Sequence, residues 1–378
     1  MQLSSSERRV LNAIWRRGPI ARGDLAVATG LTAASVTRVV QGLFEREMVR
    51  ETVERVGARG QPIRPVSVRI DGAHAIGVYF SHRSVEIGLV DMGGSQLETR
   101  TLSAEAGTPE AVAQVTRAFI ADIVARKLIR PDTLAGVGIA LPGDFILGAE
   151  QLNAHEFFPA LGKPGAVRMM AHGVDVPVFV ENDAASAALG ERLLGAGQGL
   201  NDFLFVHVGH GIGGALFLGG RLYRGVNGNA GMIGIQFPND RPRPSGQDLF
   251  AYLQREGVAV EDFPQLEALS ISGCPPLRAW IKRAGAQLRV QLAQTARILD
   301  PGTILIGGRL PLAMLNALVA EIDTSEFCNE GAGLPRPRVM ASPLGIKAGM
   351  IGAASLPIFR TLMDETDGLP TTTAGIAL

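Results

Sequence analysis

A predicted helix from Thr32 to about Glu47 carries hydrogen-bonding side chains on the face opposite its apolar stripe. Arg38 and Gln41 lie on that face, and both residue types can hydrogen-bond to base edges in the major groove of DNA. Three hydroxyl side chains near the start of the helix suit phosphate contacts: Thr32, Ser35 and Thr37. The residue types and their spacing therefore indicate chemistry directed at a nucleic acid.

The elements around this helix predict a winged helix-turn-helix. Apolar spacing favours helices over residues 5–17 and 22–29, and the second ends at Gly30. Thr32 then caps the third helix, whose apolar stripe is Val36, Val39, Val40, Leu43 and Phe44. Residues 48–52 and 66–70 read as strands around a basic loop that contains Arg59, a further candidate DNA contact. The alternative is a small helical bundle that contacts proteins.

Charge is distributed unevenly along the 378 residues, although the formal net charge is zero. Residues 1–70 hold twelve arginines and no lysine against six acids. This leaves 24 of the 36 basic and 30 of the 36 acidic residues for the rest of the chain. A basic end on an otherwise acidic protein favours a DNA-binding domain at residues 1–70.

The chain has two cysteines, Cys274 and Cys328, which are too few for a disulfide framework or a four-ligand zinc site. The start, MQLSSSERRV, lacks the apolar core of a secretory signal, and each long apolar stretch is interrupted before it reaches membrane length. We therefore expect a cytoplasmic protein with no membrane partner.

From residue 74 onward, short strand-like runs alternate with helical segments, as in α/β proteins. Two stretches, 75–97 and 203–223, share a pattern of strand, tight turn, strand and third strand. This repeat predicts two related lobes, at 71–190 and 191–363, with a cleft between them. We expect an amphipathic helix over residues 346–359 that packs at the hinge, and a flexible tail at 364–378.

Four motifs resemble the ROK family of repressors and sugar kinases. They are IALPGD at 139–144, VPVFVENDAASAALGE at 176–191, the glycine loop VGHGIGGALFLGGRLYRGVNGNAG at 208–231, and DPGTILIGGRL at 300–310. The resemblance covers nearly the whole chain, including the winged helix of the repressor branch. It implies a two-lobed, actin-like and hexokinase-type (ribonuclease H-like) α/β body, in a homodimer or tetramer.

Several positions depart from what the family's kinases need. The turn from Tyr79 to Arg83 lacks the acid and the glycines that would hold magnesium and the phosphates of ATP. His210 stands where the family has a small hydroxyl residue, and we interpret it as a loop histidine. Met232 and Ile235 replace a sugar-binding glutamate and a zinc-binding histidine, and the family's zinc cysteines are missing from the following Pro-rich loop. We therefore expect no kinase activity and neither zinc nor magnesium-ATP as cofactor.

Asp183 occupies the position of the family's catalytic base. Without a phosphate site, we expect it to cap the helix that begins at Ala184 and to bind a hydroxyl group, with no catalytic residue in the chain. The resemblance places Asn153, Asn182 and Asp183 in the ligand cleft, with Gly143 and Asp144 behind them.

These observations predict a DNA-binding transcriptional regulator, a repressor of carbohydrate metabolism, whose body binds a sugar, sugar phosphate or other sugar derivative. Two alternatives stay open. One is an active ATP-dependent sugar kinase with an appended DNA-binding domain, and the other is a regulator controlled by a protein partner.

Overall fold

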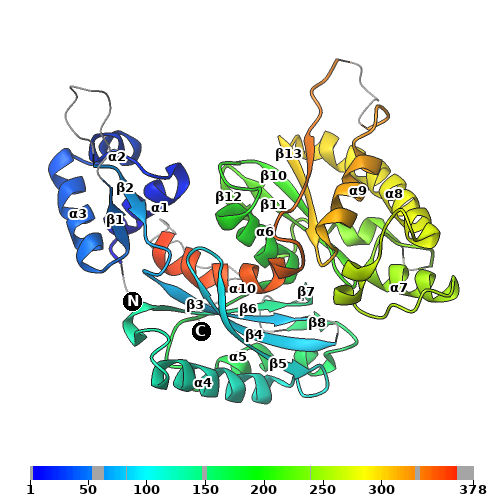
Figure 1. The fold of residues 1–378 in the computed structure, drawn as a ribbon, viewed down its shortest axis with the longest axis horizontal. Helices are drawn as coiled ribbons and strands as arrows, with labels where there is room; N and C mark the ends of the chain where they lie inside the picture. Colours follow the sequence, from blue (N-terminus) through cyan, green and yellow to red (C-terminus); the bar gives the residue numbers. More distant parts are fainter. Residues whose placement is uncertain are drawn as a thin grey trace. The chain divides into compact units, whose positions relative to one another are not determined.

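The computed structural model describes residues 3–52, 64–81, 83–146, 151–238, 240–327 and 333–363. The chain divides into two compact units. Unit 1 contains residues 1–141, 149–181 and 353–378, and unit 2 contains residues 142–148 and 182–352. Each unit is built around its own five-stranded sheet (Figure 1).

The N-terminal part of unit 1 has the predicted helices and strands. The helices are α1 (Ser5–Arg17), α2 (Arg22–Thr29) and α3 (Ala33–Glu45). Two short strands, β1 (Val49–Glu51) and β2 (Val66–Val68), pair antiparallel and are shorter than the sequence suggested. Thr32 caps α3 through its hydroxyl, as predicted. The helix ends before Glu47 because that residue adopts a left-handed φ of 58°, and the Met48 N–H donates back to the Leu43 carbonyl.

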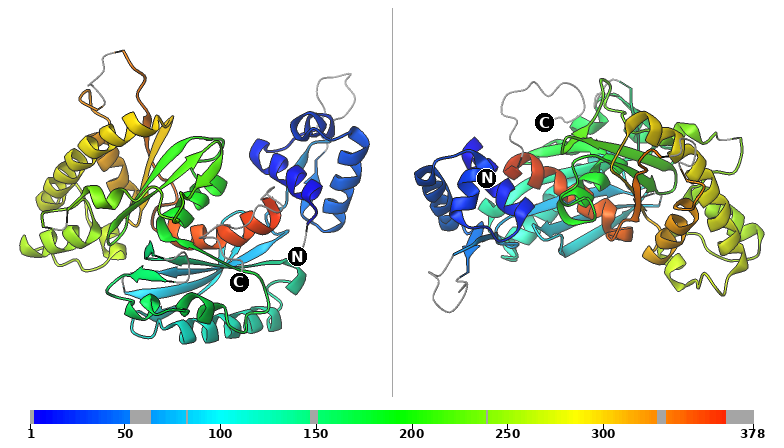
Figure 2. Two further views of the ribbon diagram at one scale, coloured as in Figure 1. Left: turned by 180° about the vertical axis from the view of Figure 1, so that it is seen from behind. Right: turned by 90° about the horizontal axis from the view of Figure 1, so that it is seen from above.

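The sheet of unit 1 has the strand order β5-β4-β3-β6-β9. Its strands are β3 (His74–Phe80), β4 (Ser84–Asp91), β5 (Gln96–Ser103), β6 (Leu134–Leu141) and β9 (Val178–Asn182). Helices α4 (Pro109–Ala125) and α5 (Ala166–Ala171) cover one face of this sheet, and α10 (Ala348–Ile358) crosses the other face (Figures 1 and 2). The short strand β8 (Leu152–Ala154) also belongs to this unit.

Helix α10 differs from the amphipathic helix expected over residues 346–359. All of its residues are buried, so the prediction of an exposed polar face was wrong. Gly138 of β6 makes the close packing possible, since a Cβ there would lie 1.9 Å from the carbonyl oxygen of Ala353. The chain continues into a π-helical turn, Phe359–Met363, which packs against α1.

The sheet of unit 2 repeats the same topology, in the order β12-β11-β10-β13-β14. Its strands are β10 (Phe203–Val208), β11 (Ile212–Leu218), β12 (Arg221–Tyr223), β13 (Thr303–Gly308) and β14 (Arg338–Ala341). Helix α6 (Asp183–Leu194) packs on β10 and β11, while α8 (Pro275–Leu299) and α9 (Leu312–Ile322) form the main core with β10 and β13. In both sheets an antiparallel meander is followed by a strand that pairs in parallel with the first strand of the meander, which agrees with the repeat seen in the sequence.

The remaining elements are short. Unit 2 also contains β7 (Gly143–Phe145) and α7 (Gly246–Arg255). The 3-10 helices are Pro131–Thr133, Pro159–Gly162, Ile233–Gln236, Phe263–Ala268 and Gly345–Lys347. None of the described helices is both long enough and apolar enough to cross a membrane.

The two units differ from the predicted lobes 71–190 and 191–363. Residues 182–190 belong to unit 2, because α6 packs on β10 and β11. Residues 353–363 belong to unit 1, where they pack against β6 and α1. The first 70 residues also cluster with unit 1, and the predicted tail at 364–378 lies outside the described residues.

Candidate nucleic-acid interface and ligand-binding residues

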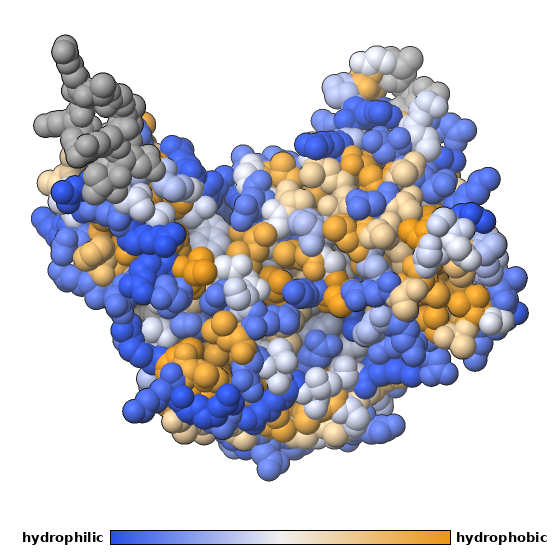
Figure 3. Space-filling view, in the orientation of Figure 1, coloured by the Kyte–Doolittle hydropathy of each residue, from blue (hydrophilic) through white to orange (hydrophobic). Residues whose placement is uncertain are grey.

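One side of α3 is exposed at every residue except the half-buried Gly42. This stripe, which we call the α3 face, consists of Ala33, Ala34, Thr37, Arg38, Gln41, Gly42 and Glu45. The opposite side is anchored by Val36, Val40 and Leu43, all of which are fully buried. The 3.6-residue period of the helix therefore separates a core face from a polar face. Hydrophilic residues cover most of the visible surface around this helix (Figure 3).

The three hydroxyl residues on α3 make hydrogen bonds within the helix. Thr32 Oγ1 accepts from the backbone N–H of Ser35 at 3.2 Å and donates to Ser35 Oγ at 2.9 Å. Thr37 Oγ1 donates to the carbonyl oxygen of Ala33 at 2.9 Å. These bonds fix the hydroxyl rotamers near the start of the helix, where the N–H groups and the helix dipole favour an anion.

Arg38 and Gln41 lie side by side on the α3 face, one helical turn apart. In the part of the chain that the structure describes, Arg38 makes no hydrogen bond or ion pair. Gln41 Nε2 donates to Glu45 Oε1 at 3.0 Å. Arg59, the predicted contact from the wing, lies outside the described residues.

Three other arginines near the N-terminus are paired with acids. Arg22 contacts Glu51 at 2.5 Å, and Arg46 lies 3.6 Å from Glu7. Arg69 Nη2 lies 2.7 Å from Asp71 and is hydrogen-bonded to it, which raises the pKa of Arg69 and lowers the pKa of Asp71. The unpaired guanidinium of Arg38 therefore stands out among these side chains as one available to a partner.

The predicted ligand residues fall in different units. Asn153 lies in β8 of unit 1, whereas Asn182 and Asp183 begin α6 in unit 2. The cap of α6 is Asn182, one residue before the predicted Asp183, so that assignment is corrected. Asn182 Oδ1 accepts from the N–H groups of Ala184 at 2.9 Å and Ala185 at 3.3 Å. Asn182 has the extended backbone conformation of a cap residue, while Asp183 is already the first helical residue.

Asn182 and Asn229 together fix the strand β7. Asn182 Nδ2 donates to the carbonyl oxygen of Gly143 at 3.0 Å. Asn229 Oδ1 accepts from the Phe145 N–H at 3.0 Å, and its Nδ2 donates to the Phe145 carbonyl at 2.7 Å. Asp144, expected behind the ligand, is therefore held between two anchored residues. Sequence reasoning missed Asn229, although it lies within the glycine-rich run GNAG that already suggested a functional loop.

The turn that would hold ATP phosphates in a kinase is a closed hairpin here. Tyr79 and Phe80 at the end of β3 are buried, and the Phe80 ring packs edge-on against Phe158 with the centroids 5.0 Å apart. The Ser81 N–H donates to the Ser84 carbonyl at 2.8 Å. His82 lies outside the described residues. Aromatic core packing thus occupies the turn at which the sequence predicts the loss of a phosphate site.

His207 is a buried histidine at the end of β10. Both ring nitrogens are buried and have no hydrogen-bond partner among the described residues. Burial lowers the pKa of His207, the positive charge of Arg309 lowers it further, and the carboxylate of Asp183 opposes the shift. The Arg309 guanidinium lies over the Phe263 ring, 4.8 Å from the centroid. His207 is therefore a neutral core residue at physiological pH.

The segment that departs from the family's zinc region is held by hydrogen bonds. Arg243 Nη2 donates to the Gly234 carbonyl at 3.2 Å, and Gln287 Nε2 donates to the Pro242 carbonyl at 2.7 Å. Ile235 is 82% exposed. Asp248, near the expected last sugar-binding acid, accepts from Trp280 Nε1 at 2.8 Å and from Arg283. Hydrogen bonds from three side chains thus hold this segment in place.

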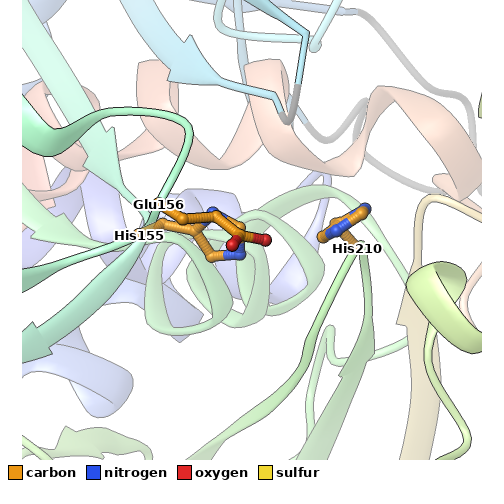
Figure 4. Close-up of side chains that lie close together, drawn as sticks. All are labelled: His155, Glu156 and His210. Carbon is orange, nitrogen blue, oxygen red and sulfur yellow. The ribbon is translucent and has the colours of Figure 1, made fainter.

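Neither unit alone, as far as its residues are described, groups three His, Cys, Asp or Glu side chains at metal-binding spacing. Figure 4 draws the side chains of His155 and Glu156, which follow β8 in unit 1, and of His210, which follows β10 in unit 2. Cys328 lies outside the described residues, and Cys274 is a buried free thiol.

A model of the ROK family matches residues 75–358. The chain belongs to the ROK family. The y4fQ protein of Sinorhizobium fredii, described as uncharacterized, is 38% identical over 360 residues, covering 95% of this chain and 92% of that protein. The xylose repressor of Bacillus spizizenii is 26% identical over 374 residues, covering 93% of this chain and 94% of that repressor.

Solved structures of other ROK proteins have the same fold. A ROK family transcriptional regulator, described as a homolog of the Escherichia coli MLC protein, matches with a TM-score of 0.68 and 23% identity, covering 93% of this chain and 95% of that one. A ROK glucokinase from Streptomyces griseus, with glucose and AMPPNP, matches with a TM-score of 0.58 and 25% identity over 75% of this chain and 99% of the kinase. This ROK protein thus has the family's sugar-kinase-like, actin-like fold. The family contains both repressors and kinases.

Proposed function

We propose that this ROK protein is a sequence-specific DNA-binding transcriptional regulator, a repressor whose affinity for its operator is set by a sugar or sugar-derivative effector. The observation that carries the proposal is the α3 face, where Arg38 has no described partner and lies beside Gln41. Helices α2 and α3, joined through Gly30 and followed by β1 and β2, act in this proposal as a winged helix-turn-helix.

DNA contacts follow from the chemistry of this face. Arg38 and Gln41 read base edges, while Thr32, Ser35, Thr37 and Arg59 contact phosphates. A homodimer or tetramer presents two such helices to the halves of an inverted repeat. The coverage of 93% of this chain by a xylose repressor supports the repressor assignment, because a match of that extent must include more than half of residues 1–70. The cytoplasm is the compartment where such a protein works.

In this proposal the effector contacts Asp183 of unit 2, where Asn182 and Asn229 hold the surrounding backbone. Asn153, in unit 1, stays a prediction from the resemblance. Asp183 is partly exposed at the first position of α6, and carboxylates and amides recognise sugar hydroxyls by paired hydrogen bonds. Effector binding changes operator affinity only if the effector binds two conformations of the protein with different affinity. In this proposal neither zinc nor magnesium-ATP takes part.

An active sugar kinase is the second candidate, favoured by the fold shared with a ROK glucokinase. The buried aromatic residues Tyr79 and Phe80 argue against it. A coupled assay for magnesium-dependent ATP turnover with a panel of hexoses tests this alternative, and turnover with any hexose would replace the regulator proposal with a bifunctional one. A regulator controlled by a protein partner is the third candidate.

Operator selection from random duplexes with purified protein, at fixed salt and with and without sugars and sugar phosphates, tests the proposal. We expect the protein to select an inverted repeat, and one compound to release the protein from it. If no compound releases the protein from the selected repeat, the DNA-binding function would stand and control by a protein partner would be favoured. The absence of any enriched sequence would overturn the proposal.

A further inference from the structure

Glu45 is a carboxylate on the surface that the proposed function directs at DNA, and the inference drawn from it rests on that function. It is the last residue of α3, and the last turn of this helix contains no basic residue. A negative charge at a helix C-terminus opposes the helix dipole, and a carboxylate near DNA repels phosphates. Glu45 is thus unfavourable both for helix stability and for general affinity.

The basic side chains near Glu45 pair with other acids. Arg46 lies 3.6 Å from Glu7, and the next acid, Glu47, contacts Arg69 and Arg130. The hydrogen bond that the structure gives to Glu45 is the one from Gln41 Nε2, at 3.0 Å. Glu45 therefore acts on the side chain one turn earlier on the same face.

This hydrogen bond fixes the orientation of the Gln41 amide, that is, which end carries Nε2 and which end carries Oε1. One Nε2–H points at Glu45, which leaves the second Nε2–H and Oε1 available. If the amide flipped, Oε1 would face the carboxylate, and two acceptors would repel each other. A glutamine with a fixed donor and a fixed acceptor matches adenine, whose N7 accepts and whose N6 donates in the major groove.

Two neighbours of Gln41 on the α3 face also have side chains that suit contacts with bases. Arg38 precedes Gln41 by three residues and offers the donor fork that matches the O6 and N7 acceptors of guanine. Ala34, four residues before Arg38, is exposed and offers a methyl group that suits the thymine methyl. We propose that Glu45 is a positioning residue for specificity, which holds the Gln41 amide in the orientation that reads adenine near the base read by Arg38.

The test compares operator selection by the full-length protein with selection by E45A and E45Q, at one salt concentration. We expect E45A to lose about fivefold or more of its preference for one A·T pair, within the range expected for a bidentate base contact. Its affinity for random-sequence DNA should stay the same or rise. E45Q should retain part of the preference, because a glutamine carbonyl can still accept from Gln41 Nε2 but its amide can also turn and donate to Gln41 Oε1. All three proteins should unfold at similar temperatures, since Glu45 is exposed.

Two further variants isolate the Gln41–Glu45 pair. Q41A should lose the same base preference, and E45A added to Q41A should change no base preference further. D24N removes one exposed negative charge from α2 and should leave the preference at that pair intact. Equal selection by E45A and wild type would overturn the inference, as would equal loss in E45A and E45Q. If wild type enriched no sequence, the proposed function itself would fail.

Discussion

Glu47 and Arg130 form an ion pair that joins the end of α3 to the turn before β6, within unit 1. Arg69 lies 3.4 Å from the same carboxylate and 2.7 Å from Asp71, at the exit from the N-terminal strands. The backbone is close here too, because a Cβ at Gly72 would lie 2.8 Å from the Glu47 carbonyl oxygen. Helix α3, which carries the proposed DNA-contacting face, is thus held to the sheet of unit 1 by ion pairs and by close packing.

R130Q should loosen this junction with little effect on global stability. The side chains of Arg130 and Glu47 are 56% and 47% exposed, so water and salt screen their attraction. We expect faster amide hydrogen exchange at residues 69–73 and a nearly unchanged melting temperature. K347Q, which removes a positive charge elsewhere on the chain, is the control. Unchanged exchange in R130Q would show that the Glu47–Arg130 ion pair does not hold the junction.

D183A should separate effector response from DNA binding. Asp183 lies at the start of α6, far in sequence from the α3 face, and its Oδ1 accepts from the Ala184 N–H. We expect a weaker response to the effector and nearly unchanged operator affinity in the ligand-free protein. Fluorescence anisotropy with labelled operator, titrated with effector, measures both quantities. Equal loss of both would contradict the division of roles.

Glu191 should make stability depend on pH. It is fully buried in α6, where it accepts from the Ser342 hydroxyl and from the Ala196 N–H at 2.8 Å. Burial raises the pKa of Glu191, an effect that these hydrogen bonds reduce. The folded state therefore holds the proton more tightly than the unfolded chain. The stability from this group is present below the unfolded pKa and is lost as the pH rises through the folded pKa.

E191Q removes this titration. We expect its free energy of unfolding to fall less than that of wild type as the pH rises above the pKa of an ordinary glutamate, about 4.3, because the wild-type carboxyl then titrates at its raised pKa. Denaturant unfolding at a series of pH values measures the difference. E191A should be less stable than E191Q by about 1 to 3 kcal/mol, since it leaves buried donors without an acceptor. Parallel pH profiles for E191Q and wild type would contradict the assigned pKa shift.

Arg243 should stabilise the loop that follows the 3-10 helix Ile233–Gln236, and we expect this loop to need no metal. R243A removes the bond to the Gly234 carbonyl and should lower the free energy of unfolding by about 1 to 3 kcal/mol, as expected for a charged hydrogen bond. Treatment of wild type with EDTA should leave its melting temperature unchanged. A lower melting temperature after chelation, restored by zinc, would contradict this account.

The elements that the sequence predicted are those with local signals. Thr32 marks the start of α3, because its side chain caps a backbone N–H only three residues later. Short, nearly continuous apolar runs mark the buried strands β3 and β10. The repeat of strand patterns predicted both sheets. The burial of α10 on all sides was missed, because it depends on the close approach permitted by Gly138 more than two hundred residues away.

The candidate site was predictable only in part, for the same reason. Arg38 and Gln41 were placed on the exposed face by helical period alone. The Asn229–Phe145 pair spans 84 residues and the Glu191–Ser342 bond spans 151, so neither leaves a local pattern. The Gln41–Glu45 bond lies within one helical turn, but the choice between glutamine orientations needs the structure.

The most direct test of the central claim is the binding of wild type and R38A to the selected operator and to its single-base variants at fixed salt. If Arg38 reads a base, R38A should lose about 1 to 3 kcal/mol of binding free energy and should relax specificity at one position. Binding by R38A with unchanged affinity and unchanged specificity would contradict the account, because the α3 face would then not be the surface that reads DNA.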